Sequence, residues 1–335
     1  MTHPAPVLSI VVIGRNEGER LAACLKSIRA ARMPGPVELI YVDSGSADES
    51  AGLAATFGAE VIVLESGRMS AARARNAGWR SAKSPFILFL DGDTILDPDF
   101  VDISLKAFDD PGVAVVWGQR REMRPEASIY NRICDLDWIA RPGYSDFCGG
   151  DSIMRREVLE RTNGFNPDLI AGEEPDLCRR IRGLGGKILH LAIPMTRHDL
   201  AFVHFSQYWR RAVRTGHAYA EIAGRYRDTR DPLWTRESRH NFRHGFLYLA
   251  VLAGAVIVAE MRHTLVPVLL LAVAGAALAL RTAFHSRWKA PSWPTLVLFG
   301  IHSHVQHVPV LQGQLLYLWA RWRGQRRELI EYKSS

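Results

Sequence analysis

The sequence is poor in cysteine and in lysine. Its 335 residues include four cysteines, none in Cys-x-x-Cys spacing, which excludes a disulfide-built scaffold and the common zinc motifs. We expect each cysteine to be a small buried apolar residue. Only six of the 42 cationic residues are lysine, and many of the arginines cluster beside aromatic or long apolar runs.

The sequence also lacks a secretory signal and a dinucleotide-binding motif. The first residues, MTHPAP, lack the basic region of a secretory signal, and the apolar run 7–13 is only strand length, so we expect the N-terminal part to stay in the cytosol. GRNEGE stands where a dinucleotide-binding protein would have Gly-x-Gly-x-x-Gly, which argues against a dehydrogenase. An apolar content of 47% excludes a disordered chain.

The net charge of +7 conceals a division of the chain. Residues 1–200 sum to −4 and residues 201–335 to +11. The positive charge flanks apolar runs rather than the net-negative N-terminal part, and this argues against a nucleic-acid-binding protein. The chain therefore reads as two parts with different tasks.

The first 120 residues alternate apolar, β-rich runs with helical stretches. We predict strands at 7–13, 37–43, 61–64, 86–90 and 113–117, and helices at 17–31, 48–57, 70–82 and 98–108. Continuously apolar strands that alternate with helices indicate an α/β fold, with a parallel sheet covered on both faces. Further on, we predict helices at 126–140, 155–161 and 173–184 and a strand at 187–191.

Polar residues collect where three of these strands end. They are Asn16 and Glu17 after the first strand, Asp43 at the end of the second, and Asp91 with Asp93 after the fourth. Because a ligand site of such a sheet lies at the carboxyl ends of its strands, we expect these side chains to form one site.

Three Asp-x-Asp pairs occur, and their context separates them. Asp91-Gly92-Asp93 follows five apolar residues at a strand end, where two carboxylates can hold one hard cation. The pairs 97/99 and 135/137 are predicted to be structural, the first as a helix start and the second inside a helix.

The C-terminal part contains two apolar runs, Phe246–Ala259 and Thr264–Leu280. A membrane-spanning helix needs about 20 apolar residues, with roughly 17 as the lower edge, so each run alone is marginal. Together they predict a helical hairpin, and the arginines on its outer flanks place both ends in the cytosol. A buried helical pair and a re-entrant hairpin are the alternatives.

The stretch Pro294–Trp322 carries His302, His304 and His307, but their spacing does not set all three on one helical face, which argues against a metal site. We predict an interfacial or third membrane helix here, followed by a basic tail.

Six runs in order resemble the motif series of the inverting family 2 glycosyltransferases. They are IVVIGRNEGERL, YVDSGSADES, ARARNAGW, FILFLDGD, GGDSIMRREV and GEEPDLCRRIRGLGGKI, within residues 7–200. The resemblance implies a GT-A fold, which is a Rossmann-like and mostly parallel sheet with helices on both faces. It also implies a nucleotide-diphosphate sugar donor, a divalent cation (Mg²⁺ or Mn²⁺) and a single-displacement transfer.

The same resemblance assigns roles to individual residues. The implied donor-binding residues are Asn16, Glu17, Asp43, Arg73, Arg75, Asn76 and Asp91. The implied metal ligands are Asp91, Asp93 and His198, with a surface position in a loop as the alternative for His198.

The general base is implied to lie in Glu173-Glu174-Pro175-Asp176. Glu174 stands where family members usually have aspartate, and a carboxylate can accept the proton of an attacking hydroxyl. Glu173 or Asp176 could serve instead, and helix capping is a competing role for all three.

Processive synthases of the same superfamily carry Gln-x-x-Arg-Trp, and this chain keeps only Gln207-x-x-Arg210. The missing tryptophan argues against a polymerising enzyme. We predict an amphipathic interfacial helix over 207–220, with Gln207, Trp209, Arg210 and Arg211 on the acceptor and membrane side.

The expected organisation is a catalytic domain at 1–200, an interfacial helical segment at 201–243 and a membrane-associated part at 244–335. The expected function is transfer of one sugar from a nucleotide-diphosphate sugar to a hydroxyl of a lipid-linked glycan, on the cytoplasmic side of a bacterial inner membrane. A polyprenyl-phosphate acceptor and a catalytically inactive membrane scaffold are the alternatives.

Overall fold

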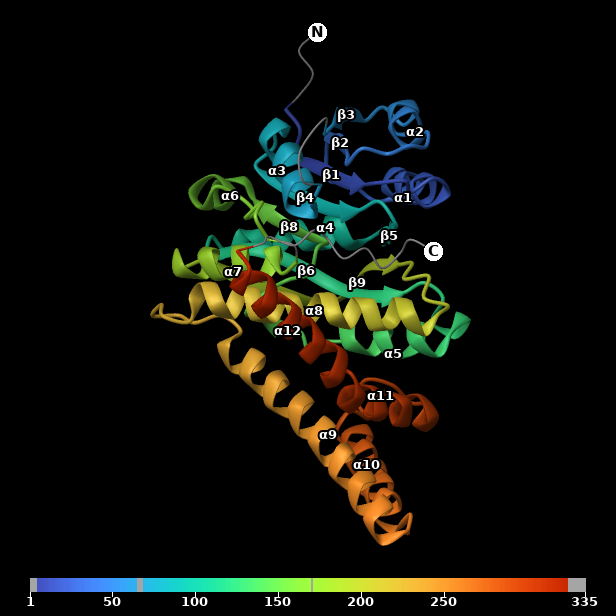
Figure 1. The fold of residues 1–335 in the computed structure, drawn as a ribbon. Helices are drawn as coiled ribbons and strands as arrows, with labels where there is room; N and C mark the ends of the chain where they lie inside the picture. Colours follow the sequence, from blue (N-terminus) through green and yellow to red (C-terminus); the bar gives the residue numbers. More distant parts are fainter. Residues whose placement is uncertain (1–4, 65–68, 170, 325–335) are drawn as a thin grey trace. The chain divides into compact units, whose positions relative to one another are not determined.

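The computed structural model describes residues 5–64, 69–169 and 171–324 (Figure 1). The chain divides into two compact units. The sheet unit comprises Met1–Met123 and Trp138–Asp199, and the helical unit comprises Arg124–Asp137 and Leu200–Ser335. The basic tail predicted after residue 324 lies outside the described residues.

The strands are β1 (Leu8–Gly14), β2 (Val37–Asp43), β3 (Glu60–Val63), β4 (Phe86–Asp91), β5 (Thr94–Leu96), β6 (Val113–Glu122), β7 (Gly143–Tyr144), β8 (Ser152–Arg155) and β9 (Lys187–His198). The helices of the sheet unit are α1 (Glu19–Ala30), α2 (Ser50–Thr56), α3 (Ala71–Ser81), α4 (Phe100–Leu105), α6 (Arg156–Thr162) and α7 (Glu173–Gly183). Two short 3₁₀ turns lie at Lys106–Asp109 and Pro125–Ala127.

The strands form one sheet in the order β3-β2-β1-β4-β8-β6-β9-β5, with β7 paired to β9. The strands β3, β2, β1 and β4 are mutually parallel, as the sequence predicts. From β8 onward the sheet is mixed, because β8, β5 and β7 pair antiparallel with their neighbours while β6 and β9 run parallel. The predicted α/β class is confirmed.

The central strands β1 and β4 are buried on both faces, which explains why they are apolar along almost their whole length. In β1, Ile10 and Val12 point to a core shared with α1, α2 and α4, whereas Val11 and Ile13 point to a core shared with α3, α6 and α7. Alternate side chains of a strand face opposite sides, so a strand covered on both sides has no polar face. All four cysteines are free and buried, as predicted.

The register of the parallel strands aligns their carboxyl ends. Gly14 of β1 pairs with Asp43 of β2, and Ile13 of β1 pairs with Asp91 of β4. The loops that leave these strands therefore start at the same edge of the sheet.

The helical unit contains α5 (Ile129–Trp138) up to Asp137, α8 (Phe205–Tyr226), α9 (Thr235–Arg262), α10 (Val266–His285), α11 (Trp293–Val305) and α12 (His307–Trp322). The predicted stretch 294–322 thus forms two helices. Gly216 of α8 and Gly313 of α12 let these two helices cross closely, because a Cβ at either position would collide with the other helix's backbone.

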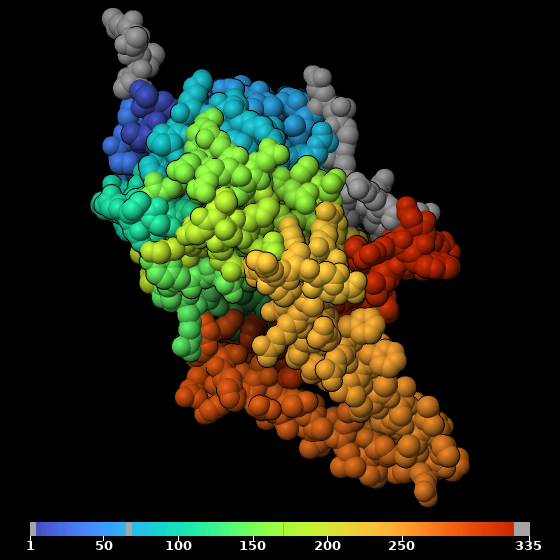
Figure 2. Space-filling model, turned by 90° about the vertical axis from the view of Figure 1, so that its left-hand side faces the viewer, coloured from blue at the N-terminus to red at the C-terminus, as the bar shows by residue number. Residues whose placement is uncertain are grey.

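Helices α9 and α10 are long and apolar enough to cross a membrane, judged by length and composition. Their large apolar side chains lie at the surface of the helical unit, and the helices are coloured amber to orange in Figure 2. Phe246 is 63% exposed and Leu270 is 64% exposed. An exposed apolar surface of this extent is typical of a segment that contacts a membrane or another protein.

Candidate active site

The pairing of β5 with β9 brings Asp93 and His198 together, and Asp91 lies two residues before Asp93. Asp91 ends β4, Asp93 precedes β5, and β5 pairs antiparallel with β9 so that Thr94 lies opposite His198. Nε2 of His198 lies 3.3 Å from Oδ1 of Asp93. One ligand atom from each of the three residues lies within 4.8 Å of the others.

These three residues fit a divalent cation. Two carboxylates supply the oxygen ligands that Mg²⁺ and Mn²⁺ prefer. Burial, together with the charge of Arg120, lowers the pKa of His198 to about 4, so the imidazole is neutral and able to ligate. Nδ1 of His198 is buried without a hydrogen-bond partner among the described residues, as expected of a nitrogen reserved for another ligand. His198 is the last residue of β9 and is 6% exposed, not a surface loop residue.

Arg75 of α3 connects this group to the predicted base. Its Nη2 donates to Oδ1 of Asp91 at 2.9 Å, and its Nη1 donates to Glu173 at 3.0 Å and to Glu174 at 3.1 Å. The side chain is 3% exposed. Burial opposes its charge, but Asp91, Glu174 and Glu173 together raise the pKa of Arg75 above its usual value. One buried cation therefore holds three carboxylates.

The three candidate bases occupy different surroundings on the first turn of α7. Burial raises the pKa of Glu174 to about 7, and the adjacent Glu173 carboxylate adds to the increase. Glu173 is 7% exposed and Glu174 is 17% exposed. Asp176 is fully buried, and its Oδ2 accepts two hydrogen bonds from Arg180. Glu174 is thus the most accessible of the three and the one with a pKa near neutrality.

Sequence reasoning assigned no role to Arg120 and Asp151, which complete the cluster. Oδ1 of Asp151 accepts from the backbone N–H of Asp91 at 3.1 Å, and Oδ2 accepts from Arg120 at 2.7 Å and from Thr196 at 2.7 Å. Arg120 also lies 3.4 Å from Asp91. Asp151 belongs to the quoted GGDS run and could have been noticed, whereas Arg120 lies beyond the predicted end of its strand.

Gly150 lies against the same cluster. A Cβ at this position would come within 2.5 Å of Nη2 of Arg75, 3.2 Å of Oε1 of Glu174 and 3.3 Å of Oδ2 of Asp91. A side chain here would displace these groups, so the glycine is required by close approach.

The residues predicted to meet the nucleotide form the loops after β1 and β2. Oδ2 of Asp43 accepts from the backbone N–H of Gly45 at 3.0 Å and of Ser46 at 2.7 Å. The side-chain oxygen of Asn16 accepts from the N–H of Ala47 at 2.7 Å, which ties the two loops together. Glu17 forms an ion pair with Arg20 at 3.0 Å.

The remaining donor-side residues lie on α3. Asn76 is 4% exposed, and its amide exchanges hydrogen bonds with the backbone of Phe165 and accepts one from Trp79. In the structure it anchors the turn at 164–165. Arg73, on the same helix, is half-buried.

The residues predicted on the acceptor side lie on α8 and divide into two pairs. Trp209 and Arg210 line a pocket of about 330 Å³ together with Phe205 and Ser206. Gln207 instead caps the start of the helix through Val203 and His204, and Arg211 lies 3.7 Å from Asp137.

Comparison with known proteins shows that this chain is similar to glycosyltransferases. The family model described as "Glycosyl transferase family 2" matches residues 9–162. Glycosyltransferase AglE of Haloferax volcanii is 22% identical over 236 residues, which cover 66% of this chain and 76% of the relative. The pre-mycofactocin glycosyltransferase of Mycobacterium tuberculosis is 28% identical over 349 residues, covering 90% of this chain and 70% of the relative. Against several other curated relatives the chain spans only 35% to 57% of their length.

Among solved structures, this chain is similar to a mannosyltransferase of Pyrobaculum calidifontis in complex with GDP-Man and Mn²⁺. The TM-score is 0.69 at 20% sequence identity, and the match covers 95% of this chain and 88% of that one. The likeness confirms the predicted GT-A type of fold.

Proposed function

Because this chain belongs to glycosyltransferase family 2 and is a nucleotide-sugar-dependent enzyme, we propose that it transfers one sugar, with inversion, to a hydroxyl of a lipid-linked glycan. The observation that carries the proposal is the position of Glu174. It is a carboxylate with a pKa near neutrality, held by the same guanidinium as Asp91. A hydroxyl acceptor needs a base at this place, and a carboxylate whose pKa lies near the working pH is suited to it.

In this proposal Glu174 accepts the proton of the acceptor hydroxyl. The hydroxyl oxygen forms a bond to C1 of the donor sugar as the bond from C1 to the diphosphate oxygen breaks, and the diphosphate leaves with the electron pair. Arg75 fixes the orientation of Glu174 through its 3.1 Å hydrogen bond. Asp43 and Asn16 shape the loops proposed to receive the nucleotide.

We propose that Asp91, Asp93 and His198 hold Mg²⁺ or Mn²⁺. A divalent cation bound there would neutralise charge on the diphosphate. Arg120 and Asp151 position Asp91, one through its side chain and the other through its backbone. Arg73 is proposed as a further donor contact.

We propose an amphipathic acceptor because the helical unit has both polar and apolar surface. The pocket of Phe205, Trp209 and Arg210 combines aromatic rings with a cation, which suits a sugar or phosphate at a lipid surface. Arginines flank the apolar runs within α9 and α10, which supports placing 244–335 in a bacterial inner membrane and 201–243 at its cytoplasmic surface.

A donor screen tests this function. The purified full chain, in detergent with Mg²⁺ or Mn²⁺, is given UDP-, GDP- and dTDP-sugars, first alone and then with a lipid extract of bacterial membranes. We expect hydrolysis of one donor, and transfer of its sugar into the lipid fraction only when the extract is present. Hydrolysis without transfer to any lipid would contradict the acceptor class, and no turnover of any donor would leave the inactive scaffold as the better reading.

A further inference from the structure

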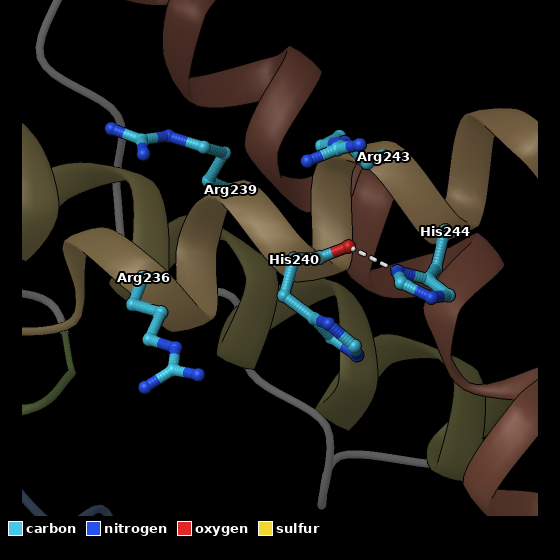
Figure 3. Close-up of a pocket in the computed structure, with 5 residues that line it drawn as sticks. All are labelled: Arg236, Arg239, His240, Arg243 and His244. Atoms are coloured by element: carbon cyan, nitrogen blue, oxygen red, sulfur yellow. Dashed lines mark hydrogen bonds between the residues drawn. The ribbon is translucent and has the colours of Figure 1, made fainter.

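The first turns of α9 carry a basic pocket that sugar transfer does not use. It has a volume of about 300 Å³ and is lined by Arg236, Arg239, His240, Arg243 and His244 (Figure 3). Their spacing of three, four, seven and eight residues from the first sets all five on one face of the helix. A volume of this size is at the lower end of those that hold small molecules, about 300–1,000 Å³.

Among the described residues, no carboxylate pairs with the arginines of this pocket. Within 5–64, 69–169 and 171–324, no carboxylate lies within ion-pair distance of Arg236, Arg239 or Arg243. Like charges three or four residues apart destabilise a helix. An anion between these side chains would remove that cost, and guanidinium groups bind phosphate oxygens in a bidentate manner.

The imidazoles add hydrogen-bonding capacity. Nδ1 of His244 lies 2.9 Å from the backbone carbonyl oxygen of His240, so this nitrogen donates there, and Nε2 can donate to a phosphate oxygen when the ring is protonated (Figure 3). His240 and His244 are stacked, with ring centroids 3.9 Å apart. The pocket therefore offers a fixed set of nitrogen groups and no carboxylate.

The position of the pocket along α9 selects the kind of anion. Phe246 and Leu247, two and three residues after His244, are 63% and 52% exposed, and they begin the apolar length of the helix. With a rise of about 1.5 Å per residue, the basic face ends within one turn of that apolar surface. A lipid bilayer has the matching arrangement, with a layer of phosphate groups next to the hydrocarbon. Basic residues beside a membrane helix attract anionic lipids.

We propose that this pocket binds the head-group phosphate of an anionic membrane lipid. Such a lipid is a bound partner and is not consumed, so this site goes beyond the proposed transfer reaction. The basic and apolar surfaces of α9 are continuous. This favours a lipid over free phosphate, because only a lipid has acyl chains that can contact the apolar surface.

Native mass spectrometry of the full chain in neutral detergent tests the proposal. The probes are phosphatidylglycerol, phosphatidylcholine and inorganic phosphate. We expect phosphatidylglycerol to bind at least tenfold more tightly than phosphatidylcholine, and the triple variant R236Q/R239Q/R243Q to lose at least tenfold of that affinity. The control R29Q/R80Q/R161Q removes the same charge at exposed positions of the sheet unit and is expected to bind as the parent does.

Three results would overturn this site. They are equal binding of the two lipids, equal loss of affinity in both triple variants, and displacement of the lipid by inorganic phosphate at concentrations similar to those of the lipid. The last result would assign the pocket to free phosphate. A donor-hydrolysis rate measured on each variant shows that the sheet unit is still folded, so loss of lipid binding is distinguished from loss of structure.

Discussion

Nη1 of Arg75 lies 3.1 Å from Oε1 of Glu174, although 99 positions separate the two residues in the sequence. The same guanidinium contacts Asp91, so the carboxylate proposed as base and a carboxylate proposed as metal ligand share one cation. A change at either end of this arrangement is therefore transmitted to the other.

Replacing Glu174 with glutamine distinguishes a hydroxyl acceptor from a phosphate acceptor. The amide cannot accept the proton of a hydroxyl, and loss of a general base costs about 10²–10⁴-fold in rate. A phosphate oxygen is already ionised and needs no base. We expect a loss of turnover of at least about a hundredfold with the lipid acceptor, whereas E157Q, an exposed glutamate, leaves it unchanged. Near-normal turnover of E174Q would indicate a polyprenyl-phosphate acceptor.

The pH dependence of transfer follows from the same carboxyl group. Burial raises the pKa of Glu174 to about 7, and the base acts only when it is deprotonated. The apparent kcat/KM is expected to be constant above this value and to fall about tenfold per pH unit below it. In E174Q this dependence on acid should disappear from the residual activity. If the variant keeps the same acidic limb, another group titrates.

Gly150 provides a test that removes no functional group. A methyl group there would come within 2.5 Å of Arg75 and within about 3.3 Å of Glu174 and Asp91, so G150A should displace the cluster. A misplacement of about 1 Å at a catalytic group can cost about a hundredfold in rate. The control is G149A, because a Cβ at the neighbouring glycine meets nothing within 4 Å. Steady-state transfer rates should fall for the first variant only.

The sequence predicted the part of this site that rests on regular alternation. Asp43, Asp91 and Asp93 follow apolar strands whose register could be anticipated, because parallel strands end at one edge. Arg120 could not be placed, since the polar end of β6 reads as a loop but pairs with β9 through register shifts between Trp117 and Arg120. Contacts across an irregular pairing depend on tertiary structure and leave no period in the sequence.

His198 is a second site residue that the strand pattern did not place, because β9 is longer than predicted. The run predicted to end at residue 191 continues to His198, which is how this histidine becomes buried beside Asp93. The residues between contain proline, threonine and arginine, which weaken a strand prediction. The resemblance to family motifs supplied His198 where periodicity did not.

Removing Arg75 should destabilise the fold as well as the site. Its side chain is 3% exposed and is the shared partner of Asp91, Glu173 and Glu174. Breaking a buried ionic group by removing one partner costs about 3–5 kcal/mol, because the remaining charges stay buried. R75Q should lower the melting temperature of the sheet unit at pH 8 and abolish transfer. R80Q, an exposed arginine on the same helix, should change neither.

Replacing Asp93 with alanine tests the metal site through Mn²⁺ binding, which is measured without turnover. Asp93 is 3% exposed and lies beside His198, so its carboxylate is not part of the solvated surface. Titration of Mn²⁺ followed by electron paramagnetic resonance should show one site in the parent chain. Affinity should fall at least about tenfold in D93A, because one of two anionic ligands is lost. D97A, from the neighbouring Asp-Pro-Asp pair, is the control and should bind Mn²⁺ as the parent does. Metal-dependent transfer should disappear with D93A, and an active, metal-independent D93A enzyme would refute the assignment.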